Sequence, residues 1–463
     1  METFIGSANR GSISTGYDVE NSVKMQTAGT SSEFFNHNIS SAGSRTKGTV
    51  SMWIKRGDTG LLQYLWEQGN TDNDNGRIFA RFLADDTLRV GGGSTVLLNT
   101  ERVFRDTSAW YHIVVSIDTT SGTANNRVRI YVNGVEETFF NIRNNFSQND
   151  TTGTNFQKQF VGLSGVDESS FQSFNGYMAE VVFQDGVASA PTEFGKFDDD
   201  SGIWIPIDAS GVTMGTNGSY MKFENPSSMG AATAGHAFSV QNINQNDQCT
   251  DTPTNNFCTW NPLWVYATQP TISEGATKTV NASSDWTGAK STIGLTKGKW
   301  YWEYKALNNS SLIGIQTDGE SNIAASGNAQ SKLSTMALFL AGEVEAVDAG
   351  GSRDDTNVTF TFNAAHTFGI ALDMESSTQT ISFYQNGSLI TNGGSINIDG
   401  LADKTVFPFN AVNNNTVTVN FGGYTANAIS SAATDANGYG TFEYAPPTGF
   451  YALCSKNLAE YGG

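Results

Sequence analysis

The 463-residue sequence has only three cysteines and four histidines, the residues that form disulfides and most zinc sites. Cys249, Cys258 and Cys454 are too few for a disulfide framework. No CxxC pair accompanies the scattered histidines, which argues against a structural zinc site. We expect free thiols, with a Cys249–Cys258 bridge as the alternative.

Positive charge and long apolar runs are scarce as well. With 26 Lys and Arg against 45 Asp and Glu, the formal net charge is −19, and a surface of that sign repels phosphate backbones and anionic lipids. We therefore expect no nucleic-acid partner. No apolar run approaches the roughly 18–20 residues that span a bilayer, so no membrane insertion is expected. The start, METFIG, lacks the basic and apolar regions of a secretory signal, which predicts assembly in a cytoplasm.

Turn-forming and aromatic residues are abundant instead. The chain has 49 Gly and 29 Phe, with 38% hydrophobic residues, a composition typical of many short strands joined by turns around real cores. Residues 49–56 alternate with period two, which places Val50, Met52 and Ile54 on one face of a strand. No stretch before residue 185 has a convincing helical period. The sequence therefore predicts an all-β protein.

Strand signals divide the chain into five segments. Residues 1–20 form a Gly/Ser-rich arm, residues 21–185 a first β-sandwich and residues 284–425 a second one. Residues 186–283 are expected as an irregular but ordered connector, and residues 426–463 as an extended C-terminal tail.

Each half carries a hairpin signal of the same kind. Asn133-Gly134 and Asn386-Gly387 each follow a strand-like run, and both residue types tolerate the positive φ that a tight hairpin turn needs.

The first half resembles a laminin-G-like, concanavalin A-type jelly roll. The matching pieces, in order, are VSMWIK (50–55), WYHIVVSID (110–118), RIYVNG (129–134) and FNGYMAEV (174–181). The second half resembles a SPRY domain, another concanavalin-like sandwich, through GKWYWEY (298–304), LIGI (312–315), FGIALD (368–373) and TISFYQNG (380–387). The resemblance implies two concanavalin A-like jelly-roll sandwiches in tandem.

The tandem, with DTPTNNFCTWNP (251–262) between its halves, is similar to virion proteins of marine bacteriophages. The resemblance implies a virion location after assembly in the host cytoplasm, other virion proteins as partners, and a homo-oligomer, for which we expect a trimer. The function that it implies is a tail-fibre, spike or surface-appendage subunit that binds a glycan or protein on the host surface. The alternatives are a capsid-decorating or tail structural protein that binds only neighbouring subunits, and a polysaccharide depolymerase.

Catalytic patterns are near-misses, so we expect no enzyme. Glu343-Val-Glu-Ala-Val-Asp348 resembles the carboxylate strand motif of concanavalin-like glucanases, but the middle acid is Glu where Asp is expected, and the motif lies in the SPRY-like half. An edge strand is the plainer interpretation. His112 is expected as a packed histidine, and no GxSxG elbow or glycine-rich phosphate loop is present.

Two further sets of residues are candidates for binding. Laminin-G-like domains often hold calcium at the rim, and the loop residues Asp72, Asn73, Asp74 and Asn75 offer oxygen ligands, as does the pair Asp85-Asp86; a polar turn is the alternative. No other cofactor is expected. Sugar recognition uses aromatic platforms, and the aromatics outside the clearest core strands are Tyr64, Trp66, Trp204, Trp264 and Trp286. In SPRY-like domains rim loops bind, here residues 317–332, 341–356 and 391–415.

Overall fold

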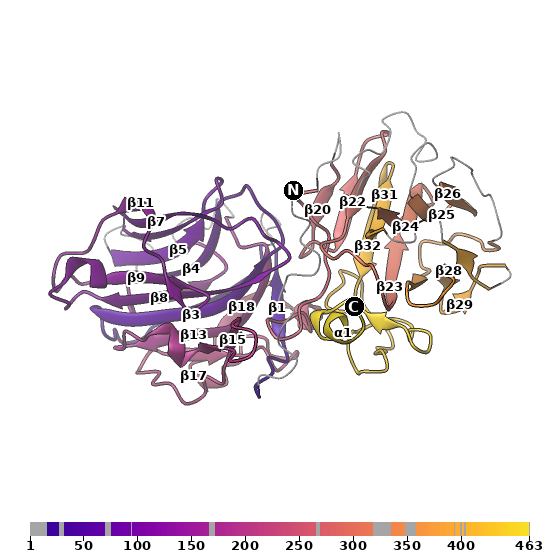
Figure 1. The fold of residues 1–463 in the computed structure, drawn as a ribbon. Coiled ribbons are helices and arrows are strands. Elements are labelled where there is room, and N and C mark those ends of the chain that lie inside the picture. The colour runs from indigo at the N-terminus through magenta and orange to yellow at the C-terminus, as the bar shows by residue number, and fades with distance from the viewer. Residues whose placement is uncertain are drawn as a thin grey trace. The chain divides into compact units, whose positions relative to one another are not determined.

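The computed structural model describes residues 16–26, 32–69, 76–93, 95–165, 172–264, 269–317, 335–347, 358–392, 394–398, 401 and 404–462. These residues form two compact units, with the division between Thr254 and Asn255. We call them the N-terminal and the C-terminal unit (Figure 1).

Two antiparallel sheets make up the N-terminal unit. The nine-stranded sheet has the order β10-β9-β8-β3-β13-β1-β19, with β16 on β13 and β17 on β16. Its strands are β1 (Ser22–Met25), β3 (Lys47–Arg56), β8 (Trp110–Asp118), β9 (Val128–Val132), β10 (Val135–Glu136), β13 (Gly176–Asp185), β16 (Ser219–Met221), β17 (Ala234–Gly235) and β19 (Gln248–Cys249).

The second sheet of this unit has eight strands in the order β11-β7-β6-β5-β4-β12-β2-β18. They are β2 (Phe34–Asn38), β4 (Gln63–Gly69), β5 (Arg77–Phe82), β6 (Thr87–Gly92), β7 (Thr95–Val103), β11 (Phe140–Arg143), β12 (Lys158–Val161) and β18 (Ser239–Gln241). A separate hairpin pairs β14 (Gly195–Phe197) with β15 (Trp204–Pro206).

The core of the N-terminal unit lies between its two sheets. Val50, Met52 and Ile54 of β3 pack there against Ile78 and Leu88 of the other sheet, which confirms the predicted alternation. The opposite face of β3 is buried too, although period two alone would leave it open to water. Residues after 185 cover that face, because Phe194, Ala209 and Tyr220 pack on Val114 and Val182.

The expected connector 186–283 is therefore divided between the two units. Strands β14 to β19 belong to the N-terminal unit, while β20 (Thr271–Ser273) and β21 (Lys278–Asn281) extend a sheet of the C-terminal unit. The low strand signal of this segment reflects very short strands, each of which pairs at a sheet edge or covers a sheet face.

A buried ion pair ties the end of the N-terminal unit to its sheet. Lys55 Nζ lies 2.7 Å from Asp251 Oδ2, and the two side chains are 0% and 1% exposed. Trp110 Nε1 donates to Asp251 Oδ1 at 3.0 Å, and Ser22 Oγ donates to the Asp251 carbonyl at 2.6 Å. Strands β1, β3 and β8 are thus fastened to one residue that follows β19.

The C-terminal unit is a second two-sheet sandwich. Its nine-stranded sheet runs β20-β21-β32-β23-β27-β28-β29, with β30 on β28 and β33 parallel to β23, and its five-stranded sheet runs β22-β31-β24-β25-β26. The remaining bounds are β22 (Thr287–Lys290), β23 (Lys299–Ala306), β24 (Ser311–Thr317), β25 (Thr335–Phe339), β26 (Glu343–Val347), β27 (Phe368–Asp373), β28 (Thr380–Gln385), β29 (Ser388–Leu389), β30 (Ile396–Asn397), β31 (Val406–Val412), β32 (Asn415–Asn420) and β33 (Tyr451–Ala452).

The expected extended tail ends in a helix. The chain is extended up to β33, which pairs with Trp300 and Tyr301, and helix α1 (Ser455–Tyr461) follows. Two prolines at 446 and 447 keep the preceding segment out of a helix, whereas SKNLAEY contains none.

Both hairpin turns were predicted correctly. Asn133 and Gly134 have φ of 48° and 79°, and Asn386 and Gly387 have φ of 48° and 73°. Each turn closes a tight hairpin, β9–β10 in one unit and β28–β29 in the other.

Candidate functional site

An open groove lies at one end of the C-terminal sandwich. It has a volume of about 550 Å³ and is lined by Leu307, Asn308, Asn309, Ala341, Phe360, Thr361 and Phe362. These residues come from the β23–β24 turn, the β25–β26 turn and the segment before β27. We call it the 307–362 groove. Its size lies within the usual range of small-molecule sites.

Apolar and polar side chains both line this groove. Phe360 and Phe362 pack on Phe368 with ring centroids 5.7 Å and 6.1 Å apart, so that the core fixes one side of each ring while the residue stays half-buried. Leu307 is 69% exposed. Such surfaces suit the apolar face of a sugar ring.

The two asparagine side chains of the groove differ in whether the protein already uses their hydrogen-bonding groups. Asn308 is fixed, because its Nδ2 donates to the Asn414 carbonyl at 3.0 Å and its Oδ1 accepts from Ser310 N at 2.8 Å. The exposed Asn309 side chain makes no hydrogen bond to any residue that the structure describes. It can donate and accept toward the hydroxyls of a ligand.

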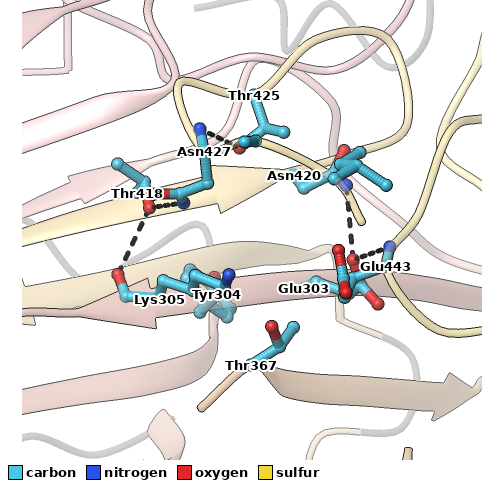
Figure 2. Close-up of a pocket in the computed structure, with 11 residues that line it drawn as sticks. Glu303, Tyr304, Lys305, Thr367, Thr418, Asn420, Thr425, Asn427 and Glu443 are labelled. Atoms are coloured by element: carbon cyan, nitrogen blue, oxygen red, sulfur yellow. Dashed lines mark hydrogen bonds between the residues drawn. The ribbon is translucent and has the colours of Figure 1, made fainter. Parts of the chain in front are cut away.

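A second, smaller pocket surrounds the buried carboxylate of Glu303 (Figure 2). Its volume of about 20 Å³ suits one water molecule rather than a sugar. Glu303 accepts from the backbone N–H groups of Glu443 at 2.9 Å and Tyr444 at 2.8 Å, from Tyr301 Oη at 3.2 Å and from Asn420 Nδ2 at 3.3 Å. Burial raises the pKa of Glu303, while these donors oppose the rise. The carboxylate links β23 to residues 443 and 444 through hydrogen bonds and therefore has a structural role.

Two of the predicted sugar platforms are closed to ligands in this structure. Trp66 is 1% exposed in the core. Trp204 is 6% exposed and covers the β9–β10 turn so closely that a Cβ on Gly134 would lie 2.3 Å from its ring.

Tyr64 lies on the outer face of the eight-stranded sheet. Its hydroxyl accepts from Arg77 Nη2 at 3.0 Å and from Arg81 Nη1 at 2.5 Å, and the residue is 3% exposed. Its ring is covered, so it cannot stack on a sugar. Its hydroxyl contacts two arginines, a cluster of cations that the sequence did not predict.

Trp264 and Trp286 both pack on the outer face of the five-stranded sheet of the C-terminal unit. Both are half-buried and pack around Leu312 and Phe409. Lys290 Nζ lies 4.1 Å from the centroid of the Trp264 ring. These two tryptophans therefore keep some exposed surface.

His112 is buried between two tryptophans, and no carboxylate among the described residues bonds to its ring. Trp204 Nε1, which can only donate, bonds to His112 Nδ1 at 3.0 Å. The other nitrogen, Nε2, therefore carries the proton and donates to Ser51 Oγ at 2.8 Å. Full burial lowers the His112 pKa to about 3. The ring cannot take a proton from Ser51, so this Ser–His pair is a packing contact.

Glu180 is a buried carboxyl group that the sequence did not reveal. It occupies a bulge in β13 with φ of 50°, and its Oε2 accepts hydrogen bonds from Tyr17 Oη, at 2.9 Å, and from Tyr220 Oη. Burial raises its pKa to about 7. The two phenols seal the carboxyl group, and the contact anchors Tyr17, which lies in the expected N-terminal arm.

Two stacked histidines make the N-terminal unit sensitive to acid. The rings of His37 and His236 lie 3.7 Å apart, and burial lowers the pKa of both, to about 4 for His236. The folded state therefore favours neutral rings, and this contribution is complete above about pH 6.5 and lost as the pH falls toward 4. We expect about 1–2 kcal/mol of destabilisation between pH 7 and pH 4.5 from the pair after discounting for its partial exposure. Urea titrations of wild type and His236→Gln measure it, and an equal pH slope in both proteins would contradict it.

The proposed calcium ligands Asp72, Asn73, Asp74 and Asn75 lie outside the described residues. In the second acidic pair, Asp86 forms ion pairs with two arginines: Arg56 Nη1 and Arg105 Nε each lie 2.9 Å from its carboxylate. Within the described ranges no group of three or more His, Cys, Asp or Glu side chains could hold a metal ion.

Other sequence candidates are only partly described. In the glucanase-like motif, Glu343–Val347 forms β26 at the edge of the five-stranded sheet, while Asp348 lies outside the described residues. Of the predicted rim loops, residues 318–332 and 348–356 lie outside the described residues. Ala341 lines the groove, residues 343–347 form β26, and in the third loop residues 406–412 form strand β31.

All three cysteines are buried, and none forms a disulfide. No helix in the described part of the chain is long and apolar enough to cross a membrane.

Comparison with known families bears on the fold of the N-terminal unit. Residues 6–192 match a laminin G family model described as the concanavalin A-like lectin/glucanases superfamily. The predicted all-β, concanavalin A-like fold class is confirmed. No curated protein matches the chain.

Similar solved structures are distant. Domains LG4-5 of the mouse laminin alpha1 chain are 11% identical, with 90% of this chain and 86% of that chain covered and a TM-score of 0.30. The TRIM65 PSpry domain is 13% identical over 35% of this chain and 89% of that chain, with a TM-score of 0.28. A putative carbohydrate binding protein from Bacteroides ovatus is 15% identical over 49% of this chain and 58% of that chain, with a TM-score of 0.30. Scores this low carry no argument about function.

Proposed function

We propose that this chain is a non-enzymatic binding protein of a bacteriophage virion, a tail-fibre, spike or appendage subunit that recognises a saccharide on the host surface. The observation that carries the binding role is the 307–362 groove, where half-buried phenylalanines and an uncommitted asparagine amide lie side by side. The sequence resemblance to marine phage proteins supports the virion location. Rigid sandwiches that carry polar loops suit recognition.

A saccharide screen with groove variants tests this proposal. We expect the Leu307→Ala/Asn309→Ala double variant to bind the best host-surface saccharide about tenfold more weakly, about 1.4 kcal/mol, because it loses an apolar contact and a hydrogen-bonding amide. Both side chains are exposed, so the variant should fold normally. The control is Leu389→Ala, which removes an exposed leucine of the same unit outside the groove. Unchanged affinity in the double variant, measured by calorimetry, would sink the assignment of the groove.

A structural role in the capsid or tail is the second candidate function. It is favoured by exposed apolar side chains at the end of β7, on β10 and between β10 and β11: Val103 is 44%, Val135 54% and Phe139 71% exposed. β10 and β11 are the end strands of their two sheets, and exposed apolar edges favour contacts with neighbouring subunits. Adsorption separates the candidates. Soluble protein that competes with phage for host cells favours the first, and antibody labelling of virions without such competition favours the second.

A depolymerase is the remaining alternative. New reducing ends released from host polysaccharide, and lost in Glu343→Gln, would favour it over a binding protein.

A further inference from the structure

Strands β4 to β7 are neighbours in the eight-stranded sheet of the N-terminal unit, and their outer face carries cations and aromatics. Ala80 of β5 and Val90 of β6 point into the core, so the residues beside them, Arg81 and Arg89, point outward. Both arginines are half-buried on this face.

Arg81 and Arg89 lie directly opposite each other. They are register partners in the antiparallel pair β5–β6. Like charges in this position destabilise a sheet, since the side chains of cross-strand partners are neighbours. The pKa of Arg89 is lowered, first by burial and then by the charge of Arg81. The fold therefore contains a repulsive pair that packing alone does not require.

No described carboxylate pairs with either guanidinium, although acids outnumber bases in the chain by 45 to 26. Arg81 Nη1 donates to the Tyr64 hydroxyl, and its guanidinium lies 4.9 Å from the centroid of the Phe79 ring. Arg89 Nε donates to Asn99 Oδ1 at 3.2 Å. Asp85, four residues from each arginine, is held by the backbone N–H and the hydroxyl of Thr87, and Asp86 pairs with Arg56 and Arg105.

Hydrogen-bond donors remain for a ligand. The two terminal nitrogens of Arg89 make no hydrogen bond to a described residue and can donate to a ligand. Neutral side chains thus contact the two guanidiniums, while the Asp85 carboxylate attracts Arg89 from beyond ion-pair distance. An anionic group between them would accept charge-assisted hydrogen bonds and relieve the repulsion.

We infer that the Arg81–Arg89 pair is a binding site for the acidic group of an anionic saccharide, a carboxylate or a sulfate. A long polyanion such as nucleic acid or an anionic membrane is disfavoured, because the chain as a whole carries −19. A single acidic substituent on a saccharide is small, so the positive charge of Arg81 and Arg89 outweighs the repulsion from the rest of the chain. This site lies in the other unit from the 307–362 groove, so either can fail without the other.

Binding of defined polymers tests the inference. The probes are polygalacturonate, dextran sulfate, neutral dextran and a single-stranded oligonucleotide, at low and at physiological salt. We expect polygalacturonate or dextran sulfate to bind, and the affinity to fall at least about tenfold, about 1.4 kcal/mol, in Arg81→Gln/Arg89→Gln. The polymer that binds more tightly identifies the acidic group. Affinity should weaken with salt.

The matched control is Arg129→Gln. Arg129 lies on β9 of the other sheet, half-buried, with its guanidinium 5.7 Å from the centroid of the Tyr131 ring, so it mimics the packing without the facing arginine. It should leave binding unchanged. A structural role for the pair would lower the melting temperature of Arg89→Gln, whereas relief of repulsion should leave it equal or higher. The inference is overturned if neither acidic polymer binds, if the double variant binds equally well, or if the oligonucleotide binds most tightly.

Discussion

The Asp251→Ala variant is expected to lose about 3–5 kcal/mol of the free energy of unfolding of the N-terminal unit, as is usual when one partner of a buried ion pair is removed. The change takes away the carboxylate that neutralises the fully buried Lys55 ammonium and accepts from Trp110 Nε1. Urea denaturation followed by tryptophan fluorescence measures it, because the indole of Trp110 is part of the contact.

The control for this prediction is Asp118→Ala. Asp118 pairs with Lys47 at 3.1 Å, but these side chains are 24% and 39% exposed, and an exposed pair contributes about 0–1 kcal/mol. Equal losses of unfolding free energy in the two variants would contradict the prediction, because the buried pair would then stabilise the unit no more than an exposed one.

In the C-terminal unit, Glu303→Ala is expected to cost about 3–5 kcal/mol, since each buried donor left without an acceptor costs about 1–3 kcal/mol. The backbone N–H of Glu443 and the side chain of Asn420 lose this acceptor (Figure 2). The backbone N–H of Tyr444 and the hydroxyl of Tyr301 lose it too. Glu443→Ala is the comparison variant, because it keeps the backbone donor and removes only a partly exposed carboxylate bonded to Ser430. Calorimetry of the two variants would contradict the prediction if their transitions fell by the same amount.

Local patterns predicted those parts of the fold that local physics decides. Period two placed Val50, Met52 and Ile54 in the core, and the Asn-Gly pairs adopted the positive φ that their chemistry permits. These features need only neighbouring residues.

Features that depend on register were not predictable. In β4 the register shifts between Tyr64 and Trp66, so that both Leu65 and Trp66 face the core and simple alternation fails. The opposition of Arg81 and Arg89 likewise follows from a pairing that neither residue reveals alone. The same holds for residues after 185, whose role in covering a sheet face depends on contacts with distant strands.

The three buried thiols give the chain an internal reporter of opening. Burial raises the pKa of Cys454 to about 12 and that of Cys249 well above its usual value, so neither forms appreciable thiolate while it stays enclosed. A thiol-alkylating reagent would then modify each site at a rate set by how often the surrounding structure opens. Because Cys249 belongs to one unit and Cys258 and Cys454 to the other, mass spectrometry of the alkylated peptides would time the opening of each half within one intact molecule.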